Sequence, residues 1–411
     1  MPSRLTKITS KYSEHTLADY SKLLWKINTS EKITVDPLLL KVLKKYLTKQ
    51  HHDPLLIERF FEQLSKTPIL QTTHHLTPTQ GPVFNTVDIV ALSGLPNDFI
   101  YPVGVCSGTA FSNTAFSGAL CFRQLDWSQL FRPNSKLLNV ALKSQAERSA
   151  HGSEEKRFSL IPSSYRDALV YRSPILAGMA DKIDELAKQL KEFLPDPRLF
   201  DSYTSWVLTA QQKMQQSLHP TKSMLFFDLN EVVAEYIAEC LETQTDHPIS
   251  EFLSTLLNSG GHGTSDDNPC LFLCDLIKNK GHKVGKVFLS DLLKKGMGLS
   301  EITYQLRSGK WCPSVYLVFY SMAYICGIKC LGSFQQCEYL PELLDGWSQV
   351  SDTSHIATTN HALYPSLTTG KLEYDGDWIY SLDYFMSEKS INLPSISSTV
   401  MSHVWQPISS N

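Results

Sequence analysis

The segment from Thr72 to Pro82 combines histidine, hydroxyl, amide and glycine residues where a predicted strand gives way to a predicted helix. Free backbone N–H groups and the positive end of the helix dipole at such a turn favour a bound anion. Imidazole titrates near neutral pH, so it suits proton transfer beside that anion. We therefore predict a phosphate or carboxylate site. Its predicted proton-transfer residues are His74 and His75, and its predicted anion-binding residues are Thr77, Thr79, Gln80 and Gly81.

The same loop has a plainer interpretation, in which its histidines and threonines only cap the helix and fill a turn. It matches neither the Walker A pattern nor the GxGxxG fingerprint, so it indicates no particular cofactor. The histidine pairs His51–His52 and His74–His75 lack the i, i+4 spacing of a zinc-binding helix, and the chain has no CxxC pair. We predict no metal site and leave the cofactor unassigned.

A second candidate is Cys106, because Gly104–Gly108 fits G-x-C-x-G, the nucleophile-elbow pattern with cysteine in place of serine, directly after a predicted strand. Such an elbow must lead into a helix whose N-terminus activates the nucleophile. Residues 109–122 are instead rich in Thr, Ser, Phe and Gly and are typical of a loop or strand. Either a cysteine nucleophile or a plain strand exit fits this pattern. Histidines at 355, 361 and 403 are available as a base, and nothing selects one of them.

A third candidate is the polar stretch Gly332–Glu338, which contains Gln335 and Gln336. It follows the apolar run Val315–Ile328, which predicts a buried core helix ending near Gly327. The stretch would return polar groups to one edge of the core, where the glutamines could contact a substrate. Alternatively, they are surface residues of a new helix, since exposed polar residues are common.

Apolar periodicity predicts the elements that position these candidates. A helical hairpin is expected from two segments, 37–48 and 53–65, each opened by Asp-Pro. A strand at 68–75, a helix from 82 and a strand at 99–105 form a βαβ unit with a parallel sheet, and a strand at 222–228 followed by a helix at 229–243 gives a second βα element. Further predictions are a helix at 197–217, a turn at 309–313 and a hairpin of strands 269–274 and 286–289.

A length of 411 residues predicts more than one packed unit. We expect an N-terminal helical segment over 1–66, an α/β core over 67–345 with a helical insertion around 136–217, and an irregular C-terminal covering region over 346–411. The 42% hydrophobic and 19% charged residues are ordinary for a globular protein.

A net charge of -3 gives no broad attraction for nucleic acid or an acidic membrane. Residues 1–26 contain no apolar core of a secretory signal, and the run at 315–328 is shorter than the about 20 residues that span a bilayer. Nine cysteines is an odd number, and most lie in apolar runs, so no disulfide framework is expected. These features predict a cytoplasmic protein with a small-molecule substrate and neither a nucleic-acid nor a membrane partner.

The stretch His74–Phe84, followed by a helix and Ile100–Val105, resembles the bacillithiol-synthesis cysteine-adding enzymes, which have a Gln/Gly-rich strand-to-helix loop ending in Gly-Pro. Trp311–Phe319 together with Gly332–Gln336 is similar to that family's apolar helix after a proline-containing turn. The resemblance covers under a fifth of the chain. It implies a Rossmann-like fold, a substrate loop at 74–81 and a small anionic or sugar-bearing substrate. The resemblance does not extend to the reaction, because this chain lacks the heptads of the family's coiled-coil arm and has Cys106–Phe111 where the family has an acidic Asp/Glu-His cluster after the second strand.

The sequence thus predicts an α/β fold with a Rossmann-like parallel sheet core, an N-terminal helical hairpin and additional helices. The preferred function is a cytoplasmic, bacterial enzyme of small-molecule metabolism that performs group transfer or ligation on a small anionic, sugar- or nucleotide-like substrate. One alternative is a cysteine hydrolase that uses Cys106. Another is a non-catalytic interaction protein whose aromatic C-terminal region docks a partner.

Overall fold

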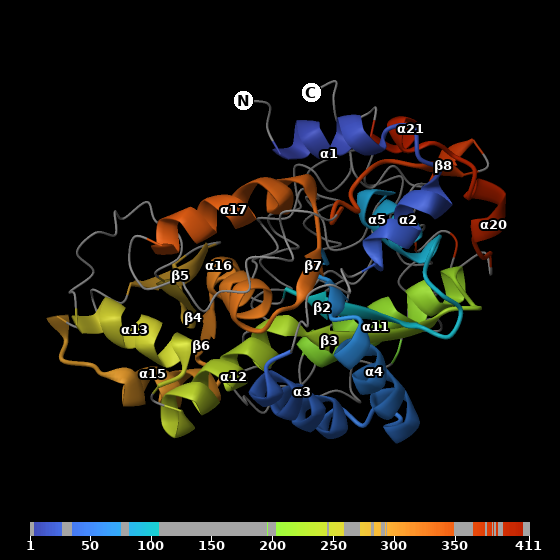
Figure 1. Ribbon diagram of the computed structural model, residues 1–411. Helices are drawn as coiled ribbons and strands as arrows, with labels where there is room; N and C mark the ends of the chain where they lie inside the picture. The colour runs from blue at the N-terminus through green and yellow to red at the C-terminus, as the bar shows by residue number, and fades with distance from the viewer. Residues whose placement is uncertain are drawn as a thin grey trace, which may run out of the picture.

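The protein is a mixed α/β molecule built on a four-stranded parallel sheet, which the computed structural model in Figure 1 shows at its centre. The strand order is β3-β2-β1-β7. The strands are β1 (Ile69–Gln71), β2 (Ile100–Val105), β3 (Ser223–Asp228) and β7 (Lys329–Leu331). The structure describes residues 4–26, 35–74, 82–106, 195, 203–244, 246–258, 272–280, 283–288, 292, 294–348, 365–374, 376–379, 381, 384 and 389–405.

The predicted βαβ unit is confirmed, because helix α5 (Pro82–Leu92) connects two adjacent parallel strands, β1 and β2. Every residue of β2 is buried, as expected for a central parallel strand with helices on both faces. The second predicted βα element is also confirmed as β3 followed by α12 (Leu229–Thr243). Asp228 ends the strand and caps the helix, since its carboxylate accepts the backbone N–H of Glu231.

Alternation along the strands divides the core into two layers. On one face Tyr101 and Phe226 pack against α2 (Leu17–Leu24), α5 and α11 (Tyr203–Leu218). On the other face Phe227 packs against α3 (Pro37–Lys49), α4 (Pro54–Lys66) and α12, which lie below the sheet in Figure 1. Helices on both faces bury both sides of the sheet and leave its strand ends for polar groups.

The predicted helical hairpin is confirmed as α3 and α4, with Asp36 and Asp53 accepting the N–H groups of Leu38 and Leu55 at their N-termini. Two earlier helices, α1 (Arg4–Tyr12) and α2, pack on the opposite face of the sheet from this hairpin. The N-terminal segment 1–66 therefore contributes to both layers.

A smaller antiparallel sheet has the strand order β5-β4-β6. The predicted hairpin is confirmed as β4 (Phe272–Lys280) and β5 (Lys283–Phe288). The predicted turn at 309–313 is confirmed only at its start, where Gly309 has a φ of 68°, because β6 (Trp311–Pro313) pairs with β4 through Cys312 and Cys274. This strand is stabilised by a partner 38 residues away in the sequence, and the local sequence around it is typical of a turn. The local pattern therefore did not predict the strand.

The apolar run 315–328 forms a short helix, α16 (Val315–Phe319), and a π-helical turn, η4 (Tyr320–Ile325), both mostly buried. Gly327 has a φ of 69° and ends the helical path as predicted. In the part of the chain that the structure describes, no helix combines the length and the apolar character that crossing a bilayer requires.

The remaining described elements surround these two sheets. Helix α17 (Phe334–Ser348) follows β7, and α13 (Pro248–Asn258) and α15 (Leu299–Arg307) pack near α12. In the C-terminal region the structure shows β8 (Glu373–Tyr374), β9 (Asp377–Trp378), α20 (Leu393–Ile396) and α21 (Met401–Trp405). Helix α21 lies beside α1, so the first and last described helices meet (Figure 1). Residues 109–122 and the predicted insertion up to residue 202, except Pro195, lie outside the described residues.

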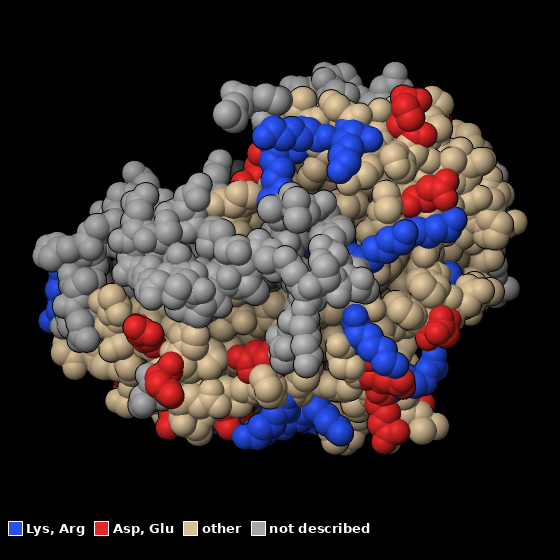
Figure 2. Space-filling model, viewed as in Figure 1, with Lys and Arg blue, Asp and Glu red and all other residues tan. Residues whose placement is uncertain are grey.

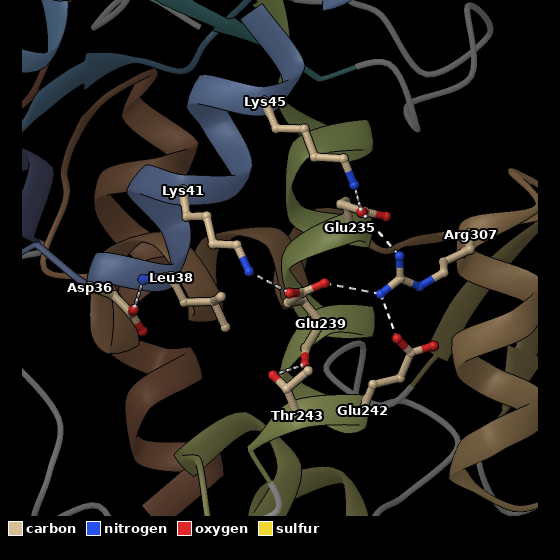
Figure 3. Close-up of polar contacts among 9 residues, drawn as sticks. All are labelled: Asp36, Leu38, Lys41, Lys45, Glu235, Glu239, Glu242, Thr243 and Arg307. Atoms are coloured by element: carbon tan, nitrogen blue, oxygen red, sulfur yellow. Dashed lines mark hydrogen bonds and ion pairs between the residues drawn. The ribbon is translucent and has the colours of Figure 1, made fainter.

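Ion pairs join α3, α12 and α15 on the outside of the molecule, and Figure 3 shows them. Lys41 and Lys45 contact Glu239 and Glu235 at 2.8 and 2.9 Å. Arg307 contacts Glu235, Glu239 and Glu242 at 3.2, 3.1 and 2.6 Å, respectively. On the face in Figure 2, acidic and basic side chains are interspersed over the described surface, so this face shows no single-sign field.

Candidate functional site

The tail of β1 runs between its two neighbouring strands at their carboxyl ends. Thr72 donates its backbone N–H to the carbonyl of Leu331 at 2.9 Å, and Cys106 donates its N–H to the carbonyl of His74 at 2.9 Å. These two bonds fix the backbone of residues 72–74 on either side. The His74 side chain is thereby held in the layer between the sheet and α5.

His74, Asp88 and Tyr101 form a fully buried cluster, each with 0% of its surface exposed. Nε2 of His74 lies 3.0 Å from Oδ1 and 3.2 Å from Oδ2 of Asp88, which comes from the middle of α5. The hydroxyl of Tyr101 on β2 donates to Oδ1 of Asp88 at 2.7 Å. The His74 ring is flanked by the rings of Phe84 and Phe226, each with its centroid 5.9 Å away. Three elements therefore lock this imidazole in one orientation.

Burial, together with the charge of Asp88, raises the pKa of Tyr101 well above its ordinary value, so the phenol remains a donor to the carboxylate. A neutral His74 that donates from Nε2 to Asp88 presents a lone pair at Nδ1. Nδ1 has no hydrogen-bond partner among the described residues. A carboxylate on one ring nitrogen and an open second nitrogen is the arrangement in which histidine acts as a general base.

Helix α11 supplies a polar stripe that faces this cluster, consisting of Gln211, Gln215 and His219 at four-residue spacing, all at most 2% exposed. Gln215 donates to the side-chain oxygen of Asn85 on α5 at 3.0 Å. Burial lowers the pKa of His219 to about 4, although the charge of Asp88 acts in the opposite direction. Neither ring nitrogen of His219 has a hydrogen-bond partner within the described ranges. The layer between α5 and α11 is thus polar inside an otherwise apolar core.

On the β7 side, Gln336 approaches the same backbone tail. It is 3% exposed and its amide nitrogen donates to the hydroxyl of Thr72 at 3.1 Å. Gly332 lets this amide come close, because a Cβ at that position would collide with it. Gln335 lies exposed on α17 instead, and Glu338 accepts the backbone N–H groups of Arg4 and Leu5 at the start of α1. The structure thus places Gln336 against Thr72, two residues before His74, whereas Gln335 is exposed.

Cys106 lies next to this site, with its Sγ 3.7 Å from the carbonyl oxygen of Thr72. Burial and then the charge of Asp228 raise the pKa of its thiol to about 12. A reactive cysteine needs the opposite, a lowered pKa that yields thiolate near neutral pH. These surroundings disfavour Cys106 as a nucleophile.

The other predicted site residues, which are His75, Thr77, Thr79, Gln80 and Gly81, lie outside the described residues. Sequence reasoning missed Asp88 and Tyr101. A signal for Asp88 was present, because it is a lone carboxylate in the otherwise apolar helical run Val87–Leu92. Tyr101 carried no comparable signal, since tyrosine is common in strands.

A second cluster of the same residue types lies on the other face of the sheet. Asp36 accepts from Tyr236 at 2.7 Å, and Nε2 of His247 lies 3.0 Å from the same carboxylate. Nδ1 of His247 accepts the backbone N–H of Ile249 at 3.2 Å. This cluster connects the N-termini of α3 and α13 to the middle of α12.

A groove of about 570 Å³ opens along β3, which is the outer strand of the parallel sheet. Its walls come from the end of α3 and one side of α11, and Phe226 reaches it from β3. Phe226 also packs edge-on against His74, with an angle of 87° between the rings. The groove and the surroundings of the buried histidine therefore have one residue, Phe226, in common.

No group of three or more His, Cys, Asp or Glu side chains that could hold a metal ion occurs within the described part of the chain. Comparisons with known proteins found no match to a family model, to a curated protein or to a solved structure.

Proposed function

We propose that the protein is an enzyme of small-molecule metabolism in which His74 acts as the proton-transfer group. The observation that supports this proposal is the difference in hydrogen bonding between the two ring nitrogens of His74. Its Nε2 is held by Asp88 at 3.0 Å inside a fully buried cluster, while Nδ1 lacks a partner among the described residues. An unpaired buried nitrogen costs free energy, about 1–3 kcal/mol. A bound substrate that offers a proton to Nδ1 would remove this cost.

We also propose that the parallel sheet is a Rossmann-like core. Its order, β3-β2-β1-β7, has the 3-2-1-4 pattern in which the chain reverses direction between the first and fourth strands. Ligands of such sheets bind beyond the carboxyl ends of the strands at this reversal. His74 follows β1 and Gln336 follows β7, so both stand at that point. This placement favours group transfer or ligation on a small anionic, sugar- or nucleotide-like substrate.

The first experiment is a thermal-shift screen of the whole chain against nucleotides, sugar phosphates and amino acids. A ligand at a hundred times its dissociation constant stabilises the folded state by about 2.7 kcal/mol, which moves the melting temperature measurably. Each ligand that shifts the melting temperature is then tested for turnover with the original protein and with His74→Gln, which keeps a polar side chain.

We expect His74→Gln to lose turnover while keeping its circular dichroism spectrum. The matched control is His247→Gln in the second cluster, which should lower stability without affecting turnover. Turnover that persists at the original rate in His74→Gln would show that His74 is not the proton-transfer group.

A further inference from the structure

The groove along β3 has the size of a small-molecule site, since such sites enclose about 300–1,000 Å³, and its own volume is about 570 Å³. It lies at the outer edge of the sheet, away from the reversal between β1 and β7. The residues that line the groove, and the hydrogen bonds at the adjacent edge of β3, determine which ligand it can bind.

Side chains of α11 already form hydrogen bonds with the outer backbone edge of β3. Gln212 of α11 accepts the N–H of Phe226 at 3.2 Å and donates to the carbonyl of Met224 at 3.3 Å. Gln216, one turn later, donates to the carbonyl of Lys222 at 2.6 Å. These bonds take up backbone groups that an added strand would need. The groove therefore does not suit strand addition by a peptide, and a small ligand is the better occupant.

The lining favours a ligand with hydroxyl groups and a negative charge. Gln50, Ser205, Thr209 and Ser217 supply amide and hydroxyl groups, and no carboxylate lines the described walls. Lys213 is a cation on the wall. Such a set of donors and one cation matches a phosphorylated polyol, the chemistry that sugar phosphates and nucleotides share.

Two further lining residues act as neutral groups. Burial lowers the pKa of His52, so this imidazole is uncharged at neutral pH. Burial and the charges of Asp228 and Glu231 raise the pKa of Tyr46, so its phenol stays protonated. The Tyr46 oxygen accepts the backbone N–H of Asp228 at 3.1 Å, and its own proton remains to be donated.

The groove is connected to His74 by the question of how a substrate reaches this buried residue. The imidazole is 0% exposed, so a substrate needs a route to Nδ1. Phe226 is one of the groove-lining residues, and its ring packs edge-on against the His74 ring. A rotation of this one side chain would join the two spaces.

We propose that the groove between α3 and α11 is the entrance and recognition subsite for a phosphorylated polyol that reacts at His74, with Phe226 as the side chain that separates the two. This inference rests on the proposed role of His74. The groove residues hold the phosphate and hydroxyl groups, and displacement of Phe226 admits the reacting part of the molecule.

The route is tested by the rate at which diethyl pyrocarbonate modifies His74, measured by peptide mass spectrometry with exposed His403 as an internal reference. Phe226→Ala should raise the rate at least about tenfold, because alanine leaves a ring-sized gap between groove and imidazole. Thr209→Trp should fill the groove and lower the rate, whereas Lys44→Trp, on the exposed side of α3 outside the groove, should not.

If Phe226→Ala fails to fold, Phe226→Leu replaces it with a smaller expected increase. An unchanged rate in Thr209→Trp, or equal rates in Thr209→Trp and Lys44→Trp, would mean that His74 is reached by another path and would overturn the proposed route.

The ligand class is tested by calorimetric titration with glucose 6-phosphate, AMP, glucose and inorganic phosphate. We expect glucose 6-phosphate or AMP to bind at least about tenfold more tightly than glucose or inorganic phosphate, a factor that corresponds to about 1.4 kcal/mol. Lys213→Glu should weaken this binding at least as much, and Lys44→Glu should leave it unchanged. Absence of binding by both phosphorylated probes, or equal effects of the two lysine variants, would overturn the ligand class.

Failure of this inference and failure of the proposed function give different results. His74→Gln should still bind the probe in the groove while losing turnover. Probe binding that depends on Lys213 together with turnover that survives His74→Gln would keep the groove and reject the base. Turnover that needs His74 but is insensitive to Thr209→Trp would keep the base and reject the groove.

Discussion

Two clusters of one histidine, one aspartate and one tyrosine occur among the described residues, on opposite faces of the same sheet, and they differ at the second ring nitrogen of the histidine. In the first, His74 meets Asp88 through Nε2, and Nδ1 has no partner among the described residues. In the second, His247 meets Asp36 through Nε2, and Nδ1 accepts the N–H of Ile249. The first cluster is fully buried, whereas the side chains of His247 and Asp36 are 10% and 13% exposed.

The difference shows how the same residue types acquire different roles. All hydrogen-bonding positions of the His247 ring serve to connect α3, α12 and α13, which is a structural use. His74 is fully buried, and its Nδ1 has no hydrogen-bond partner among the described residues. Such an unpaired nitrogen costs free energy and calls for a functional explanation. Substitutions in and around the two clusters test this contrast.

The largest contrast is expected between Asp88→Ala and Asp36→Ala. Removing Asp88 leaves the hydroxyl of Tyr101 and Nε2 of His74 buried without their acceptor, which should lower the free energy of unfolding by about 3 kcal/mol or more. Removing Asp36 also deletes the cap of α3, but water reaches this cluster, so the loss should be about 1–2 kcal/mol. Urea denaturation measures both. Equal losses would mean that burial does not separate the two clusters.

His219, which neighbours the first cluster, and Asp36 of the second cluster should also respond to acid in different pH windows. The pKa of His219 near Asp88 is lowered to about 4 by burial, so between pH 6.5 and 4 the unfolded state binds the proton first. Stability in that window therefore falls as pH falls, by up to about 3 kcal/mol. His219→Leu should flatten the slope of unfolding free energy against pH between 6.5 and 4. A slope identical to that of the original protein would contradict this assignment.

Asp36 acts at lower pH. Burial alone would raise its pKa, but hydrogen bonds from His247, Tyr236 and the N–H of Leu38 lower it below the ordinary value of 3.8. The unfolded state again binds the proton first, so the stabilisation is present above pH 3.8 and is lost as pH falls through the lowered pKa. Asp36→Asn should therefore alter the slope only below about pH 4, which separates it from His219→Leu in the same titration.

A smaller effect is expected from the paired substitutions Tyr101→Phe and Tyr236→Phe. Each deletes a hydroxyl that donates to an aspartate at 2.7 Å, and each should lower stability by about 1–2 kcal/mol. Only Tyr101→Phe should change turnover and its pH profile, because it alters the carboxylate that orients His74. A change of turnover in Tyr236→Phe would remove the functional distinction between the clusters.

The smallest effect concerns the outer ion pairs of α12, the helix that carries Tyr236. Arg307→Met removes three contacts to glutamates (Figure 3), and its side chain is 32% exposed, so water and salt screen them. We expect a loss of about 1 kcal/mol or less that shrinks further in concentrated salt. A loss that is insensitive to salt would point to packing of the arginine stem instead.

Local patterns were sufficient for the elements whose signal lies within a few turns of chain. Asp-Pro at the starts of α3 and α4, and the apolar run and helical spacing of β3 and α12, predicted those elements closely. Strands β6 and β7 were missed because pairing with distant strands, and not a local pattern, stabilises them. Strand β1 also has three residues, but the longer β-rich stretch 68–75 predicted it.

For the candidate site, the sequence by itself selected His74 and Gln336 from the residue types at predicted strand ends and turns. Only the tertiary structure decided that His74 meets Asp88 and Tyr101, that Gln335 is exposed, and that Cys106 lies in surroundings that raise its pKa. The physical reason is that protonation and orientation depend on burial and on partners contributed by other elements. The periodicity of a sequence determines which elements form, whereas their packing determines which nitrogen of a histidine is left open.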